Sequence, residues 1–277
     1  MNDRTSNFII IEHKSGWQPI NWKELWRYRD LFLFLIWRDV KTKYAQTILG
    51  IGWAIIQPVF SMIIFTIVFG NLARISSDGV PYAVFSFAAL VPWTYFSGSL
   101  SASSGSLINA SSMLTKVYFP RLIIPISPVL SQLVDFLICF NLLLVLMAFF
   151  GFYPTIEIIY IPLLIFKMAL TASGMGMWIT ALSIQYRDIK HAMGFFIQLL
   201  MYAAPVVYSV NNIPDKYRLV YGLFPMVGVI EGFRSCLLKT NPMPWDIIFI
   251  GSIVSIITFC TGLLYFNRME KNFSDVA

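Results

Sequence analysis

The stretch YAQTILGIGWAIIQPVFSMIIFTIVFGNLA, residues 44–73, contains no Asp, Glu, Lys, Arg or His. A helix needs about 20 mostly apolar residues to cross a hydrocarbon core of roughly 30 Å, and inside that core every backbone polar group must find a partner in the protein. This stretch is long enough, and further apolar stretches follow it almost to the C-terminus. The sequence therefore predicts an all-α integral membrane protein.

The composition excludes an ordinary soluble domain. Of the 277 residues, 57% are hydrophobic and 12% are charged, and the mean hydropathy is +0.70; soluble domains have about 25% charged residues. The net charge of +6 comes mainly from segments between apolar stretches, where basic residues orient the chain and meet anionic lipid, so we expect no nucleic-acid partner. The three cysteines lack CxxC spacing, which predicts neither a disulfide framework nor a metal site.

Charge-free apolar stretches predict six transmembrane helices, near residues 48–73, 82–104, 122–148, 158–182, 192–210 and 247–266. The loops on one side hold only a few basic residues, whereas most Lys and Arg lie in the N-terminal segment, the C-terminal tail and the loops on the other side. The positive-inside rule places that second side in the cytoplasm. We therefore expect a cytoplasmic segment 1–47 without a signal peptide, a six-helix domain 48–266 and a cytoplasmic tail 267–277.

The segment from Trp22 to Tyr44 differs from the spans because it mixes apolar and basic residues. The basic residues lie largely off a stripe of apolar and aromatic residues at helical spacing, which consists of Trp22, Trp26, Leu33, Trp37, Val40 and Tyr44. This pattern is typical of an amphipathic interface helix lying along the inner leaflet. A basic flank that only fixes the topology is the alternative.

A second unusual segment, residues 211–246, lies between the fifth and sixth spans. It is too polar for a full crossing and too apolar for an ordinary loop. Met226 to Lys239 can form a half-helix with Glu231 and Arg234 on one face. We expect a re-entrant element that gates an external exit, with a surface-packed amphipathic loop as the alternative.

Two ionisable residues fall inside predicted spans, Asp135 in the third and Lys167 in the fourth. Isolated charge is costly in a membrane, so we expect these two residues to pair near the midplane; a proton relay is the alternative. The spans are also rich in aromatic rings, which suit contact with sugar faces, although core packing and lipid contact need the same residues. The candidate channel aromatics are Phe85, Phe87, Trp93, Tyr95, Phe96 and Tyr202.

Motifs for catalysis are missing from the sequence. It has no GxxxxGK[ST] phosphate-binding loop, no HExxH and no GxSxG. We therefore expect no enzyme activity in this chain, and any ATP-driven process would need a separate subunit.

Several stretches together resemble the permease of an ABC-2-type polysaccharide exporter, closest to O-antigen and lipopolysaccharide export permeases. The matching stretches are ILGIGWAIIQPVFSMIIFTIVFG, VPYAVFSFAALVPWTYFSGSL, LTKVYFPRLIIPIS, LSIQYRDIKHA, PVVYS and FPMVGVIEGFR, in the order of the family and over nearly the whole chain.

This resemblance implies a homodimer in the bacterial inner membrane, with two copies of a separate ABC ATPase that hold ATP and Mg, and no cofactor on this chain. It implies coupling loops near residues 105–121 and 183–191, a gate motif in the segment 211–246, and a polyprenyl-pyrophosphate-linked glycan as substrate, drawn to basic residues beside the interface helix. The residues carried over are Lys116, Tyr118, Arg121, Tyr186, Arg187 and Asp188 for coupling, Glu231, Gly232, Phe233 and Arg234 for the gate, and Arg38, Lys41 and Lys43 for the pyrophosphate.

Other transporter classes remain as alternatives. An ABC-2 exporter of capsule, teichoic acid, a small lipid or a drug would have the same fold. An ion-coupled secondary transporter is more remote, because it predicts inverted repeats and several acidic residues at the midplane.

Overall fold

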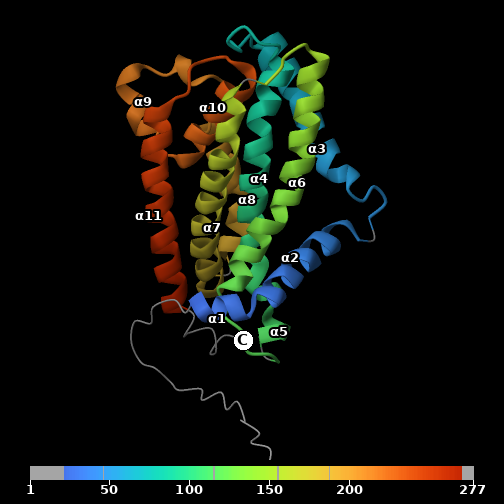
Figure 1. Ribbon diagram of the computed structural model, residues 1–277, viewed down its shortest axis with the longest axis vertical. Helices are drawn as coiled ribbons and strands as arrows, with labels where there is room; N and C mark the ends of the chain where they lie inside the picture. Colours follow the sequence, from blue (N-terminus) through green and yellow to red (C-terminus); the bar gives the residue numbers. More distant parts are fainter. Residues whose placement is uncertain (1–21, 46, 115, 155, 187, 270–277) are drawn as a thin grey trace, which may run out of the picture.

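The computed structural model describes residues 22–269 apart from 46, 115, 155 and 187, and the described residues form only helices and loops. The long helices stand side by side along one axis, and short helices gather at the two ends (Figure 1). We refer to the end with α9 and α10 as the α10 end, and to the end with α1 and α5 as the α1 end. The elements are α1 Trp22–Arg27, α2 Arg29–Tyr44, α3 Gly52–Phe65, η1 Thr66–Leu72, α4 Tyr82–Asn109, α5 Ser111–Leu114, α6 Ile123–Phe149, η2 Ile156–Tyr160, α7 Ile161–Gln185, α8 Asp188–Ala203, η3 Val210–Asn212, α9 Asp215–Tyr221, α10 Pro225–Leu238 and α11 Trp245–Met269.

Five helical stretches are long and apolar enough to cross a membrane: 52–72, 82–109, 123–149, 156–185 and 245–269. They match five of the six expected spans. The remaining expected span, 192–210, has different bounds, because α8 begins at Asp188 and ends at Ala203. Pro205 explains this end, since its ring clashes with a helical carbonyl and disfavours helical geometry in the residue before it. Residues 204–209 therefore continue from α8 toward the α10 end without helix.

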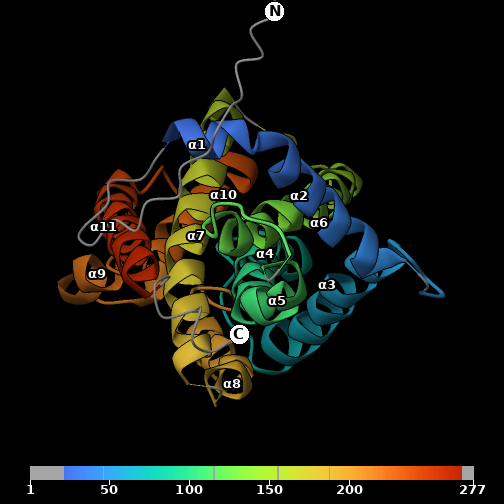
Figure 2. The same cartoon turned by 90° about the horizontal axis from the view of Figure 1, so that it is seen from below.

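Helix α4 lies at the centre of the bundle, with α3, α6, α7 and α8 around it (Figure 2). Most of α4 is buried within the subunit, whereas α3 is largely exposed. This difference places the core around α4 and leaves α3 facing outward.

Glycines allow α7 and α11 to pack closely. A Cβ atom added to Gly262 would lie 2.4 Å from the carbonyl oxygen of Gly174, and one added to Gly174 would lie 2.7 Å from the backbone of Phe259. Small residues at helix crossings let backbones approach in this way.

The segment expected to form the interface helix is helical, as α1 and α2, which adjoin at Tyr28. Helix α2 runs obliquely from the α1 end along the flank of α6 (Figure 1). Trp26, Leu33 and Trp37 of the expected apolar stripe are exposed, so they do not pack on the subunit. That outward-facing stripe is what an interface helix needs for contact with lipid.

Candidate functional site

Helix α10 is the half-helix expected in the segment 211–246, and all its residues are buried. It packs against α4, α7 and α11. Phe224, just before its start, meets Phe96 in the middle of α4, while Arg234 near its end meets Phe85 in the first turn of α4. The chain therefore descends into the bundle before α10 and returns along it toward the α10 end.

Two residues of the expected gate motif explain why α10 can sit so close to its neighbours. A Cβ atom on Gly232 would lie 2.9 Å from the end of the Leu164 side chain of α7, so that side chain would have to shift for a larger residue. Phe233 packs edge-on against Phe136 and Phe140 of α6.

The other two residues, Glu231 and Arg234, form a buried ion pair. Arg234 Nη1 donates to Glu231 Oε1 at 2.8 Å, one helical turn away. Burial raises the pKa of the Glu231 carboxyl and lowers the pKa of the Arg234 guanidinium, and the contact between the two groups opposes both shifts. Each charge therefore depends on the other for compensation.

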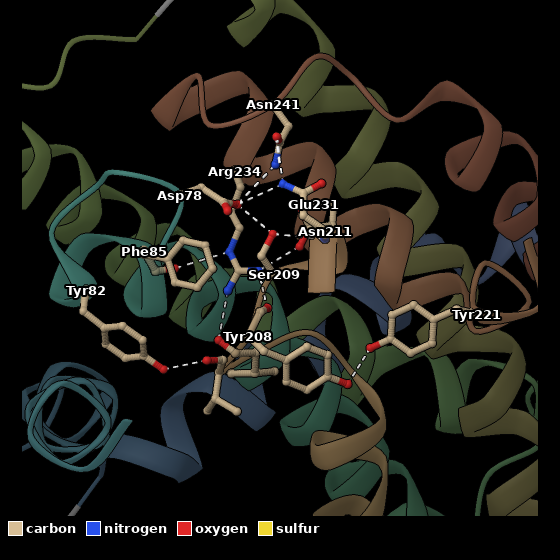
Figure 3. Close-up of polar contacts among 12 residues, drawn as sticks. Asp78, Tyr82, Phe85, Tyr208, Ser209, Asn211, Tyr221, Glu231, Arg234 and Asn241 are labelled. Carbon is tan, nitrogen blue, oxygen red and sulfur yellow. Dashed lines mark hydrogen bonds and ion pairs between the residues drawn. The ribbon is translucent and has the colours of Figure 1, made fainter. Parts of the chain in front are cut away.

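Arg234 also holds the non-helical segment that follows α8 (Figure 3). Its Nη2 donates to the carbonyl of Val206 at 2.9 Å, and its Nη1 donates to the carbonyl of Tyr208 at 3.0 Å. The guanidinium carbon lies 3.6 Å from the centre of the Phe85 ring, a cation–π contact. Backbone that leaves a helix inside a membrane protein must find new hydrogen-bond partners, and here the guanidinium supplies them.

The carbonyl between those two points the other way. Val207 accepts a hydrogen bond of 2.6 Å from the hydroxyl of Tyr82 on α4. The segment after α8 is thus held from α10 on one side and from α4 on the other.

A third set of contacts lies beside those that Arg234 and Tyr82 make with the segment after α8. It surrounds Asp78, in the connection between α3 and α4. Asp78 Oδ2 accepts hydrogen bonds from Ser209 Oγ at 2.6 Å and from Asn241 Nδ2 at 3.2 Å (Figure 3). Sequence reasoning did not find Asp78, Ser209 and Asn241 as members of one cluster, because they come from three separate connections. It also missed Tyr82 of α4 as the partner of Val207. The Asp-Gly dipeptide at 78–79 indicates a turn, but it carries no information about its partners.

The expected pair of Asp135 and Lys167 is wrong. Asp135 contacts Lys43 and Tyr44 at the end of α2, and Lys43 Nζ also donates to Gln132 at 3.0 Å. Counted from the α1 end, Asp135 is 135 − 123 = 12 residues along α6 and Lys167 is 185 − 167 = 18 residues along α7. At 1.5 Å per residue the two differ in height by about 9 Å.

Lys167 has a different environment from the one expected. Its Nζ donates to the carbonyl of Ile248 on α11 at 3.0 Å. Gly228 and Gly251 leave the space for it, since a Cβ atom on either would lie within 2.9 Å of Nζ. Lys167 therefore links α7 to the crossing of α10 and α11.

The basic residues expected to meet a pyrophosphate are partly neutralised. Arg38 Nη2 contacts Asp39 at 2.8 Å, and Lys43 contacts Asp135. Lys41 Nζ lies 4.7 Å from the centre of the Trp37 ring. Two of the three expected cations thus already have a carboxylate partner, and they do not form an open anion site in this conformation.

The expected channel aromatics divide into two groups. Tyr202 on α8 is exposed. The other five do not line an open surface, because they are buried in the core around α4: Phe85, Phe87, Trp93, Tyr95 and Phe96. Their burial corrects the expectation that they form a conduit wall, since packing in the core already occupies them.

The expected coupling residues lie at the α1 end, where α4 leads to α5 and α7 leads to α8. Tyr118 and Tyr186 are exposed there, with 62% and 54% of their surface accessible. Lys116 and Asp188 are exposed as well, and Arg121 is half-buried. Arg187 is outside the described residues.

The amino-acid sequence was compared with protein families and with known proteins, and the following matches are all to membrane transport proteins. A family model described as ABC-2 type transporter matches residues 30–238. The O-antigen export system permease protein of Myxococcus xanthus is 25% identical over 252 residues, which cover 90% of this chain and 96% of that protein. The protein of the same description from Klebsiella pneumoniae is 26% identical over 248 residues, covering 89% and 95%. The capsule polysaccharide export inner-membrane protein of Neisseria meningitidis serogroup B is 21% identical over 262 residues, covering 90% and 95%.

Proposed function

Because this chain belongs to the ABC-2 type transporter family, we propose that it is the membrane-spanning permease subunit of an ATP-driven exporter that moves O-antigen across the bacterial inner membrane. The observation that carries this proposal is the similarity to O-antigen export permeases over about nine-tenths of the chain. Export of capsule polysaccharide is the alternative, favoured by capsule polysaccharide export proteins at lower identity.

The exporter needs a partner that hydrolyses ATP, because the sequence has no phosphate-binding loop of its own. In the proposed assembly, two copies of this chain form a homodimer and bind two copies of an ABC ATPase that carry ATP and Mg. The α1 end faces the cytoplasm, as the distribution of basic residues favours. The ATPase would dock at the coupling residues there, with Tyr118 and Tyr186 offering exposed rings.

The proposed substrate is a polyprenyl-pyrophosphate-linked glycan. Lys41 is the basic residue beside the interface helix best suited to a phosphate, because Arg38 and Lys43 are already engaged by Asp39 and Asp135. At the other end, α10 and its contacts through Glu231 and Arg234 form the external gate. Among the candidate channel aromatics, Tyr202 is the one accessible to a passing sugar.

Co-expression with the cognate ATPase tests the assembly. We expect a stable complex of two permeases and two ATPases with vanadate-sensitive ATP hydrolysis. Tyr186→Ala should lower recovery of the ATPase and its hydrolysis several-fold. Tyr217→Ala is the matched control, because Tyr217 has nearly the same exposure, 55% against 54%, and lies on α9 at the opposite end. Equal recovery with both variants would refute docking at Tyr186, and no ATPase with any variant would refute the exporter class.

The substrate is tested in cells that lack this chain. Export of O-antigen predicts that lipid-linked glycan accumulates inside the inner membrane while O-antigen disappears from the surface. Loss of surface capsule with O-antigen unchanged would replace the proposal with its alternative.

A further inference from the structure

At the α10 end, residues of two connections donate hydrogen bonds to one carboxylate oxygen of a third connection. Asp78 lies between α3 and α4, Ser209 and Asn211 lie between α8 and α9, and Asn241 lies between α10 and α11. Asp78 Oδ2 accepts from Ser209 Oγ at 2.6 Å, from Asn241 Nδ2 at 3.2 Å and from Asn211 Nδ2 at 3.4 Å. Asn211 Nδ2 also donates to Asn241 Oδ1 at 3.0 Å, which closes the network.

The acceptor and its strongest donor have little freedom to find other partners. Ser209 is fully buried, so its hydroxyl cannot exchange Asp78 for water in this conformation. Asp78 has φ +52°, in the left-handed region that Asp adopts more readily than most residues, and Gly79 follows with φ +81°. The turn therefore presents the carboxylate to the two other connections.

This network acts on the segment that Arg234 holds from the other side. Arg234 on α10 binds the carbonyls of Val206 and Tyr208, and Asp78 binds the next residue, Ser209. Asn241 follows α10 by three residues, so the same carboxylate also holds the chain where it leaves that helix. Moving α10 away from α4 would pull on both sets of contacts.

Losing the contacts of Arg234 and losing the contacts of Asp78 would affect the stability of the protein differently. Arg234 is fully buried and paired, so removing it leaves a buried charge. Asp78 is half-buried, and water can replace part of what it provides. Loss of Asp78 should thus loosen the α10 end without unfolding the core.

We propose that Asp78 is a positioning residue that keeps the α10 end closed by fastening the α8–α9 connection and the α10–α11 connection to the turn before α4. The inference deepens the proposed function, because the release of this contact would be part of gate opening. Since all three donors share one oxygen, displacement of Asp78 releases the α8–α9 and α10–α11 connections from the turn before α4 together. A shift of the exposed helix α3, which leads into the Asp78 turn, would thus reach α10 through side chains rather than through the core.

Cys236 provides a native probe for this contact, because it lies on α10 and is fully buried. The permease in nanodiscs is treated with a membrane-impermeant maleimide, and labelling at each cysteine is followed by mass spectrometry. We expect Asp78→Ala to label Cys236 about tenfold faster than the unmodified protein, which corresponds to about 1.4 kcal/mol on the opening equilibrium. Asp246→Asn is the control, because it neutralises an exposed carboxylate on α11 at the same end, whose ion pair with Arg218 of α9 does not involve Asp78 or its partners.

Cys139 on α6 separates local opening from general loosening, since it too is buried. Faster labelling of Cys236 with unchanged labelling of Cys139 supports the proposal. Equal acceleration at both cysteines, or none at Cys236, would overturn it. The assay involves no transport, so its failure is separate from failure of the O-antigen and ATPase experiments.

A charge exchange gives a second test should Asp78→Ala not fold. Asn241→Asp places a second carboxylate against Asp78 and should accelerate labelling of Cys236. Adding Asp78→Asn to that variant restores one donor and one acceptor with their positions exchanged, so labelling should return toward the original rate. Labelling of the double variant as fast as that of Asn241→Asp alone would refute a direct role of this contact.

Discussion

Replacing Arg234 with methionine removes the buried guanidinium while keeping an apolar side chain of similar length. Glu231, 5% exposed, would lose its partner, and breaking a buried ion pair on one side costs about 3–5 kcal/mol. The carbonyls of Val206 and Tyr208 would lose their donor as well, at about 1–3 kcal/mol each. The sum, about 5–11 kcal/mol, is comparable with the whole stability of a typical domain, about 5–15 kcal/mol. We therefore expect Arg234→Met to yield almost no monodisperse protein.

Milder variants make this magnitude measurable by titration with SDS in mixed micelles. Arg234→Lys keeps the charge and loses at least one carbonyl contact, so it should lower the free energy of unfolding by about 1–3 kcal/mol. Adding Glu231→Gln to Arg234→Met should recover part of the lost yield, because no unpaired carboxylate remains buried. A wild-type yield of Arg234→Met would refute the reasoning. So would a double variant whose stability falls below that of Arg234→Met by as much as Glu231→Gln alone lowers the stability of the unmodified protein.

Three further changes test other contacts by the same titration. Asp135→Asn and Lys167→Met should lower the free energy of unfolding additively, within about 0.5 kcal/mol, because the two residues have different partners; a coupling energy clearly larger than this would restore the pair expected from the sequence. Gly262→Ala should cost about 1–3 kcal/mol because its Cβ would meet the backbone of α7, whereas Gly194→Ala, with open space around it, should be neutral or stabilising; equal effects would show that α7 and α11 are not closely packed. Lys43→Met should cost about 1–3 kcal/mol by leaving Asp135 without its cation, and Asp135→Asn should relieve most of that loss; no relief would mean that Lys43 acts through other contacts.

Much of the architecture could be predicted, because it follows from one-dimensional patterns. Charge-free stretches of sufficient length located five of the long helices, and an amphipathic pattern located α1 and α2. The half-helix expected at Met226 to Lys239 appears as Pro225–Leu238. The i,i+3 spacing of Glu231 and Arg234 predicted that they lie on one helix face, and the structure shows that they form an ion pair there.

The errors have a common physical origin. Pairing Asp135 with Lys167 assumed that two charges at similar distances from their own helix starts lie at similar depth, which fails for helices of opposite direction and different length. Lys43, the true partner of Asp135, lies on a helix expected to rest flat along the membrane, and the oblique path of α2 brings it there. The burial of the α4 aromatics depends on α4 being the central helix, which no property of its own sequence reveals.

The sequence by itself determined that the chain is a helical membrane protein, where five of its long helices lie and which family it resembles, because hydrophobicity, helical spacing and ordered motifs are all read along the chain. Only the tertiary structure decided that α4 occupies the centre and that Asp78, Ser209 and Asn241 meet across three connections. The same holds for Arg234, whose carbonyl partners lie 26 and 28 residues away along the chain. Contacts of this kind depend on how helices are placed around one another, and that placement is settled by packing between segments far apart in sequence.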